Sequence, residues 1–342
     1  MSPRFDENSL DDPVALATAD SALRHQAEAG SRVRRESAAA ASVLREVDRL
    51  GRPRAIVAAG PDARLLRAVL EPWCPVPFVA WPVPGLPGWA GANDMVLVLA
   101  PDGVDDGAAV TVAEALRRGA TLVLAAPGDS PVSEGLGDRY TALLPVGTGD
   151  VLAAAVVVLQ ALCRLGLGPE VDADTVAAAF DEVAVRCSPG RDVTLNPAKE
   201  LALVLADAVP LLWGGTVLSA RAARRVVEAI RTATGRAGLA ADARHLMPVL
   251  SAAGPADVFA DPFADAEQPT DRRPALVVLD DGSQEPLVRA TRAQLLATAE
   301  RHGVRSHVVA CQEGPEMARY AALLAEGTYA ATYLALGLGR FG

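Results

Sequence analysis

VLVLAPDGVDDGAAVTVAEALRRGATLVLAAP, residues 96–127, is the stretch that decides the expected fold. It indicates a buried strand, a turn, a helix that ends at Gly119, and a second buried strand. A turn between a strand and a helix is where many α/β proteins hold a phosphate. This turn instead carries Asp102, Asp105 and Asp106 and no hydroxyl group. The stretch therefore predicts a strand–helix–strand unit whose turn is poorly suited to an anion.

Short strands rich in Val, Leu and Ala alternate with helices on both sides of this stretch, as in a parallel sheet covered on both faces. The first half has predicted strands at residues 54–59, 76–81, 94–100, 120–126 and 141–146. The alternation begins again with predicted strands at residues 208–213, 274–280 and 306–311 and helices at 219–234 and 286–302. We therefore expect an α/β fold made of two doubly wound parallel-sheet domains in tandem.

The same pattern sets the expected domain boundaries. We expect an N-terminal arm and helix (1–50, loosely ordered up to 32), a first α/β domain (51–165), a helical connector (166–207) and a second domain with C-terminal helices (208–342). Residues 254–273 are rich in Pro and Asp and are predicted to form a surface loop. The C-terminal tyrosines, Tyr320, Tyr329 and Tyr333, are more typical of a core or a subunit interface than of a ligand site.

Composition excludes several classes of function. The formal net charge is −10 and the basic residues are scattered, which argues against nucleic acid or an anionic membrane as the main partner. The most apolar stretch, residues 151–163, is shorter than the roughly 20 residues of a membrane span and predicts a buried helix. The N-terminus is acidic and resembles no signal peptide. Four cysteines without C-x-x-C spacing then indicate reduced thiols in the cytoplasm.

Common cofactor and metal motifs are missing from the sequence. "AAGPDARLL" (58–66) has one glycine where a dinucleotide-binding turn needs three, and no G-K-[ST] Walker sequence occurs. The four histidines are too dispersed for a recognisable metal site. Only His245 lies near a plausible cleft, and a lone histidine is more often an exposed helix residue than a catalyst. We expect no cofactor and no metal.

Three segments carry a resemblance to a known family: "LNPAKELA" (195–202), "VPLLWGGTVLSARAARR" (209–225) and "RYAALLAEGTYAATYLAL" (319–336). With the order of elements, they resemble the bifunctional phosphoglucose/phosphomannose isomerases, which are tandem sugar-isomerase (SIS) domain proteins of archaea and actinobacteria. The resemblance covers most of the chain after residue 50, and the Ala- and Arg-rich composition suits a high-GC actinobacterium. It implies a flavodoxin-like fold for each domain, a sugar-phosphate ligand, and a homodimer with the active site built across it.

The first-domain phosphate loop of that family departs from its pattern here. The resemblance implies a turn of the form S-x-S-G-x-T, whose hydroxyls and amides hold the phosphate. The matching positions are Ala100, Asp102, Gly103 and Asp105, and only the glycine is retained. We therefore expect a degenerate phosphate loop in which Asp105 or Asp106 caps its own helix.

The catalytic groups that the resemblance implies are also not found. The family's proton-transferring Glu would fall near Thr232, with Glu228 one turn earlier. Its ring-opening His would fall at Ala252, with Val249 at the neighbouring Glu position. The family's Lys belongs to a segment that would follow "LGLGRFG" (336–342). We therefore assign no catalytic residue.

One anion site is retained as a hypothesis. A helix N-terminus with free amides, hydroxyls and nearby cations suits a phosphate or carboxylate. The candidate residues are Gly214, Gly215, Thr216, Ser219 and Arg225, the last at the position of the family's substrate-contacting Arg. The competing interpretation is an ordinary Gly-Gly strand exit, with Ser219 as the helix N-cap and the arginines in solvent.

Three functions follow from these observations. The leading hypothesis is a cytoplasmic, homodimeric tandem SIS protein that binds a carbohydrate derivative, such as a sugar phosphate, and has lost efficient isomerase activity. The second is a working aldose–ketose isomerase with relocated groups, namely Glu228, His245 and Arg225. The third is a non-catalytic scaffold that pairs with a sugar-phosphate enzyme.

Overall fold

The computed structural model describes residues 5–137, 139–253 and 273–341. The chain divides into two compact units, residues 28–178 and residues 1–27 with 179–342. We call the first the five-stranded unit and the second the four-stranded unit, after their sheets. The boundary between them falls within helix α7 (Ala173–Arg186). The predicted loop at 254–273 lies, except for its last residue, outside the described residues.

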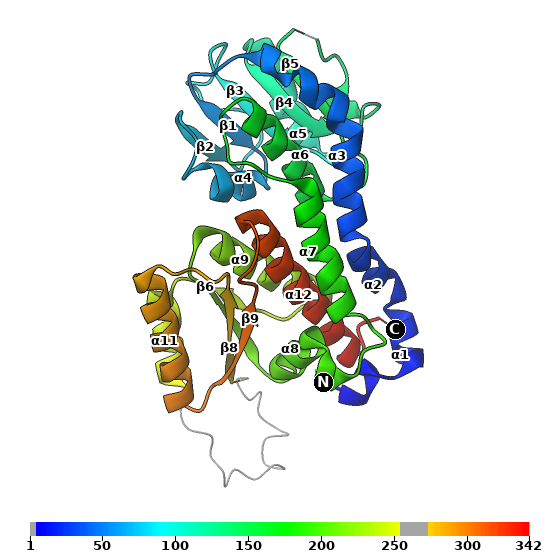
Figure 1. The fold of residues 1–342 in the computed structure, drawn as a ribbon, viewed down its shortest axis with the longest axis vertical. Helices are drawn as coiled ribbons and strands as arrows, with labels where there is room; N and C mark the ends of the chain where they lie inside the picture. Colours follow the sequence, from blue (N-terminus) through cyan, green and yellow to red (C-terminus); the bar gives the residue numbers. More distant parts are fainter. Residues whose placement is uncertain (1–4, 138, 254–272, 342) are drawn as a thin grey trace. The chain divides into compact units, whose positions relative to one another are not determined.

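The five-stranded unit has a wholly parallel sheet with strand order β2-β1-β3-β4-β5. This is the flavodoxin-like order, in which the chain reverses its direction of winding after the first two strands. Its elements are α3 (Ala29–Glu46), β1 (Ile56–Ala59), α4 (Ala63–Leu70), β2 (Phe78–Trp81), β3 (Met95–Leu99), α5 (Asp106–Arg117), β4 (Thr121–Ala126), β5 (Thr141–Pro145) and α6 (Val151–Arg164), with short 3₁₀ turns at Val47–Leu50 and Pro131–Ser133 (Figure 1). The strand–helix–strand unit predicted at residues 96–127 is confirmed as β3–α5–β4.

Small aliphatic side chains form the core of this unit. Alternate residues of the central strands, Val96 and Val98 of β3 and Leu122 and Leu124 of β4, pack in one cluster with α5. Helix α6 is buried along most of its length, as predicted for an apolar core helix. Ala, Val and Leu can fill such a core because helices approach a parallel sheet closely when their side chains are small.

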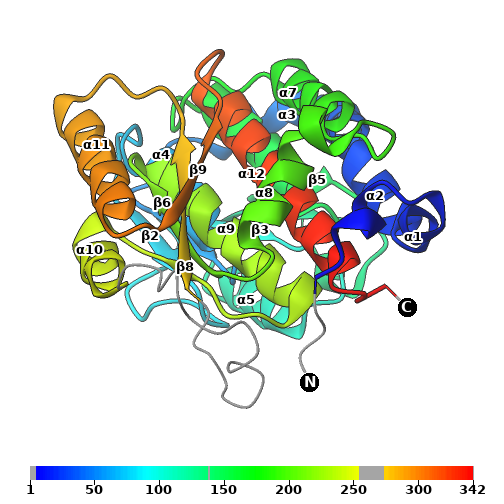
Figure 2. The ribbon, with the colours of Figure 1, turned by 90° about the horizontal axis from the view of Figure 1, so that it is seen from below.

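The four-stranded unit repeats the same topology with strand order β7-β6-β8-β9, again parallel. Its elements after α7 are a 3₁₀ turn (Val193–Leu195), α8 (Pro197–Leu205), β6 (Val209–Gly214), α9 (Val217–Thr234), β7 (Leu239–Ala240), α10 (Ala243–Ala252), β8 (Pro274–Asp280), α11 (Pro286–Arg301), β9 (Arg305–Ala310) and α12 (Glu316–Gly337). Helices α10 and α11 cover one face of this sheet, while α8, α9 and α12 lie on the other (Figure 2). Two doubly wound α/β domains are thereby confirmed.

The N-terminal residues differ from the expectation of a loosely ordered arm. Residues 7–27 form a 3₁₀ turn (Glu7–Leu10) and two helices, α1 (Pro13–Thr18) and α2 (Asp20–Ala27). They contact α12: the amide of Asp6 donates to the carbonyl of Gly337 over 2.7 Å, and the Gln26 side chain donates to Thr332 Oγ1 over 2.6 Å. Polar composition alone does not reveal such contacts, which is why the sequence predicted a loosely ordered arm.

The tyrosines of α12 lie in the core, in agreement with the prediction. Tyr320, Tyr329 and Tyr333 are at most 2% exposed. The rings of Tyr329 and Tyr333 stack at 6.5 Å, and the Tyr333 hydroxyl donates to the Cys187 carbonyl over 2.7 Å. None of the described helices combines the length and the apolar character that a membrane-spanning helix needs.

Candidate functional site

The loop predicted to be a degenerate phosphate site, residues 100–105, follows β3 in the five-stranded unit and forms a closed turn. The amide of Gly103 donates to the carbonyl of Ala100 over 2.9 Å, which makes a tight turn with Asp102 exposed at its tip. Gly103 has φ +71°, and a Cβ there would lie 2.4 Å from the Cβ of Ser130. The retained glycine is therefore explained by backbone conformation and packing rather than by a ligand.

Asp105 is the N-cap of α5. Its Oδ1 accepts a hydrogen bond from the amide of Ala108 over 2.6 Å, and Asp106 is the first helical residue. The expectation that a carboxylate caps this helix is confirmed, with Asp105 in that role. The cap uses an amide that a phosphate would need and leaves a negative charge in its place.

The second candidate site, at the N-terminus of α9, also has a complete cap. Thr216 and Ser219 form a capping box: the Thr216 amide donates to Ser219 Oγ over 2.9 Å, and the Ser219 amide donates to Thr216 Oγ1 over 3.2 Å. The alternative interpretation placed the cap at Ser219, and this is corrected to Thr216, because the helix begins at Val217 rather than at residue 219. Each of the two hydroxyl groups therefore already accepts a hydrogen bond from the backbone amide of the other residue.

The two glycines before Thr216 lie against neighbouring atoms. A Cβ on Gly214 would lie 2.1 Å from the backbone carbon of Ser219, and one on Gly215 would lie 2.3 Å from the Val288 side chain. Gly214 therefore has no room for a side chain against α9, and a side chain at Gly215 would displace Val288 of α11.

One carboxylate contacts this cap. The Thr216 hydroxyl donates a hydrogen bond to the Asp281 carboxylate, which follows β8 and is 9% exposed. Arg225 lies two turns further along α9 and pairs with Glu228 over 3.0 Å. The structure thus brings Thr216, Ser219 and Asp281 together and places Arg225 with Glu228.

The positions matched to the family's proton carriers hold no ionisable group. Thr232 lies exposed on α9, and Val249 and Ala252 lie on α10. Of the relocated candidates, Glu228 is held by Arg225, while the exposed His245 on α10 accepts a hydrogen bond from Arg244 Nε over 3.1 Å. Each candidate is therefore bonded to a cation on its own helix.

A carboxylate and an imidazole do approach each other elsewhere. His307 Nδ1 of β9 lies 3.9 Å from Glu200 Oε1 of α8. His307 sits in the middle of its strand, whereas ligand sites of this fold lie at the carboxyl ends of the strands. Burial lowers the pKa of His307, partly opposed by Glu200, so the imidazole is neutral at pH 7. We assign this pair to the packing of α8 on β9.

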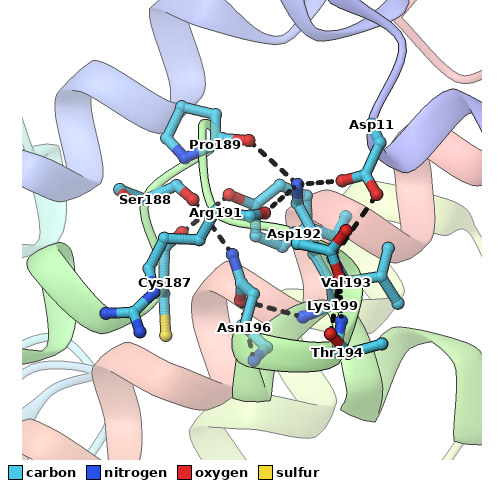
Figure 3. A network of polar contacts seen from close by, with 12 residues as sticks. Asp11, Cys187, Ser188, Pro189, Arg191, Asp192, Val193, Thr194, Asn196 and Lys199 are labelled. Atoms are coloured by element: carbon cyan, nitrogen blue, oxygen red, sulfur yellow. Dashed lines mark hydrogen bonds and ion pairs between the residues drawn. The ribbon is translucent and has the colours of Figure 1, made fainter.

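Lys199, in the "LNPAKELA" segment, is the only lysine of the sequence and is fully buried. Its ammonium group donates to Asp11 Oδ1 over 2.6 Å, to the carbonyl of Arg191 over 2.7 Å and to that of Pro189 over 2.9 Å. It also lies 5.5 Å from the centre of the Tyr333 ring. Figure 3 shows how this network joins the N-terminal segment to the loop before α8.

Sequence reasoning missed this network because its members lie up to 188 positions apart. A signal was present: all other basic residues except histidine are arginines, so a single retained lysine is unusual. A compact ammonium group can direct three donors at three separate acceptors, which the flat guanidinium of arginine cannot do in the same space.

The buried Cys187 does not suit the role of a thiolate nucleophile, and the described residues form no metal cluster. Burial, with a smaller contribution from Glu326, raises the pKa of Cys187 to about 12, so its thiol stays protonated at neutral pH. Within the described ranges, no three His, Cys, Asp or Glu side chains group closely enough to hold a metal ion.

Comparisons with known proteins agree with the fold. Residues 194–340 match the family "Bacterial phospho-glucose isomerase C-terminal SIS domain". No curated protein matches the chain.

Solved structures extend the likeness over both units. The C-terminal domain of glucosamine-fructose-6-phosphate aminotransferase from Francisella tularensis is 10% identical, with TM-score 0.62, covering 93% of this chain and 96% of that one. Tagatose-6-phosphate ketose/aldose isomerase from Escherichia coli is 14% identical, with TM-score 0.61 and coverage of 95% and 94%. Identities this low establish a shared fold only. Residues 194–340 thus match a SIS-domain family of bacterial phosphoglucose isomerases, and the chain as a whole shares the fold of these solved structures.

Proposed function

We propose that this protein binds a carbohydrate derivative, a sugar phosphate in the first instance, and does not interconvert aldose and ketose phosphates. The observation that carries the proposal is the Asp105 cap, which puts a carboxylate where the resembling family has a phosphate-binding hydroxyl. The protein has the fold of the resembling family but a carboxylate in place of this hydroxyl, which favours a changed activity.

The carboxylate disfavours phosphate binding by an amount that Coulomb's law estimates. A phosphate about 5 Å from a carboxylate is repelled by roughly 3 kcal/mol per charge pair at an effective dielectric near 20. The helix dipole offers an anion only about 0.3–1 kcal/mol. The repulsion from the carboxylate therefore exceeds the attraction from the helix dipole. We expect the α5 loop to reject phosphate.

Proton transfer is the second support. Moving a proton between neighbouring carbons needs a base in contact with the substrate, usually a carboxylate or an imidazole. Thr232 and Ala252 cannot act as one, and Glu228 is already bonded to Arg225. These observations favour binding without isomerisation over the relocated-group hypothesis.

We place the anion of the ligand at the N-terminus of α9, near Gly214, Gly215, Thr216 and Ser219, with Arg225 supplying charge. The Asp281 carboxylate is the competing group, because it already accepts the Thr216 hydroxyl. An anion must bind beside this carboxylate or displace it. We therefore expect weak binding that Asp281 limits.

We also propose that the protein works as a cytoplasmic homodimer, as the resemblance implies. The SIS fold supports this proposal. Light scattering, which measures the size of the protein in solution, tests whether it is a dimer. A monomer at micromolar concentration would contradict the dimer without affecting the binding proposal.

Fructose 6-phosphate titrated by calorimetry tests the anion site. Asp281→Asn should tighten binding about fivefold or more, because the amide still accepts the Thr216 hydroxyl but carries no charge. Arg225→Met should weaken binding, and Arg224→Met, an exposed neighbour on the same helix, should leave it unchanged. An Asp281→Asn protein that binds no better than the native one would contradict the site. Absence of binding for every sugar phosphate would favour the scaffold hypothesis instead.

A further inference from the structure

Arg319 lies in the first turn of α12 and reaches the carboxyl edge of the four-stranded sheet. Strands β6, β8 and β9 are parallel, so Thr216, Asp281 and the loop 311–315 before α12 all follow strand ends at this one edge. Arg319 Nη1 donates to the backbone carbonyl of Asp281 over 2.9 Å. A guanidinium group is therefore held at the edge where doubly wound folds bind their ligands.

Asp281 connects this guanidinium group with the capping box of α9. Its carbonyl accepts from Arg319, while its carboxylate accepts the Thr216 hydroxyl. Because the carbonyl and the carboxylate of one aspartate are only a few bonds apart, the cation and the cap lie within the length of one residue. An anion that binds at the cap beside Asp281 therefore has Arg319 as a neighbouring cation.

Most of the hydrogen-bonding capacity of Arg319 is unused. A guanidinium group has five N–H donors. Among the described residues, Nε of Arg319 is buried and finds no acceptor, and the only hydrogen bond from the side chain is that of Nη1. The residue as a whole is partly exposed, so rotation of its flexible side chain can turn Nε towards a ligand. A buried donor without an acceptor is unfavourable, and a ligand oxygen that accepts from it is favoured.

Two other arginines that follow these strands are bound to carboxylates. Arg225 pairs with Glu228 over 3.0 Å, and Arg292 is bonded to the carboxylate of Asp280. A carboxylate partner offsets the charge that a cation offers to an anionic ligand. Arg319 is bonded to a neutral carbonyl instead, so more of its charge remains for a ligand.

We propose that Arg319 directly contacts the anion of the ligand at the N-terminus of α9. Two oxygens of the phosphate accept from Nε and from a terminal nitrogen at once, which is the two-point contact that arginine makes with phosphate. The inference rests on the proposed function and deepens it, because it gives the anion a direct partner and leaves Arg225 a longer-range role. It also requires a ligand with two charged oxygens side by side, so an uncharged sugar does not suffice.

Fructose 6-phosphate is the probe, and the Nε–H resonance of Arg319 in a nitrogen-15 correlation spectrum is the readout. Its loss in Arg319→Lys assigns the resonance. The phosphate supplies a charged acceptor, so this proton should shift downfield in a saturable way. Fructose without phosphate should leave it unchanged. The shift is measured on the native protein, so it does not depend on how well a variant folds.

Calorimetry with the same ligand compares the arginines. Arg319→Met should weaken binding about tenfold or more, and Arg319→Lys should recover only part of the loss, because lysine keeps the charge but not the two-point contact. Arg225→Met should weaken binding by a smaller factor, since Glu228 already shares its charge. Arg301→Met removes an exposed arginine at the other end of α11 and should leave the affinity unchanged.

The inference is overturned if native protein binds fructose 6-phosphate without a shift of the Arg319 resonance, or if Arg319→Met binds as tightly as native protein. Either result leaves the proposed function standing, since the ligand still binds. If native protein binds no fructose 6-phosphate at all, the inference and the anion site proposed at α9 both fail.

Discussion

Replacing Lys199 with methionine is expected to destabilise the four-stranded unit by about 1–3 kcal/mol, because three acceptors lose a charged hydrogen-bond donor. Methionine keeps the length of the side chain but donates no hydrogen bond. The carbonyls of Pro189 and Arg191 and the carboxylate of Asp11 then lose their shared donor. Urea denaturation followed by far-ultraviolet circular dichroism measures the loss.

Matched variants identify the cause. Lys199→Arg keeps the charge but should still destabilise, because a planar guanidinium does not fit three separate acceptors. Asp11→Asn should cost about 1–2 kcal/mol, since the amide oxygen still accepts from the buried Lys199 ammonium but no longer carries the opposite charge. Arg24→Met breaks an exposed pair with Asp20 and should change stability by less than about 0.5 kcal/mol. If Lys199→Met is as mild as Arg24→Met, the network does not hold this unit together.

Gly214→Ala is expected to destabilise the same unit by about 3 kcal/mol or more, at or above the upper end of ordinary overpacking. The new Cβ would lie 2.1 Å from the backbone carbon of Ser219 and 2.4 Å from the amide nitrogen of Ala220. Both atoms belong to the first turns of α9, which cannot rotate away as a side chain can. Thermal unfolding gives the measurement.

Gly190→Ala is the control for this substitution. Apart from its chain neighbours, no described residue has a heavy atom within 4 Å of a Cβ built on Gly190, so alanine should be neutral or stabilising by up to about 1 kcal/mol. A Gly214→Ala protein with native stability would mean that packing does not require the Gly-Gly turn, and would strengthen the case that the turn is reserved for a ligand.

The sequence predicts the sheets well because their strands are buried and apolar. The interiors of strands β3, β4 and β8 are continuous runs of Val, Leu and Ala, and β6 is also mostly apolar. Such runs bounded by turn residues have few other structures open to them. Strand β7 has only two residues, too few for any periodic signal. Helix α10 carries Pro248 in its interior, which hides the helical pattern.

In the candidate sites, contacts between residues close in sequence can be predicted and contacts between distant residues cannot. The Asp105 cap depends on residues three positions apart, so local sequence is enough to predict it. The contact of Thr216 with Asp281 joins residues 65 positions apart, and the Lys199 network is more distant still. Such contacts are created by the topology of the sheet, and a single sequence carries no direct record of them.

The most direct test of the account is isomerisation itself. Fructose 6-phosphate, glucose 6-phosphate and mannose 6-phosphate should each be incubated with the protein and followed by coupled dehydrogenase assays. We predict no conversion above the protein-free control, because the positions matched to the family's proton carriers, Thr232, Val249 and Ala252, hold neither a carboxylate nor an imidazole. Turnover near or above about 1 s⁻¹, within the usual range of enzymes, and lost in Glu228→Gln, would contradict this account and establish an isomerase with relocated catalytic groups.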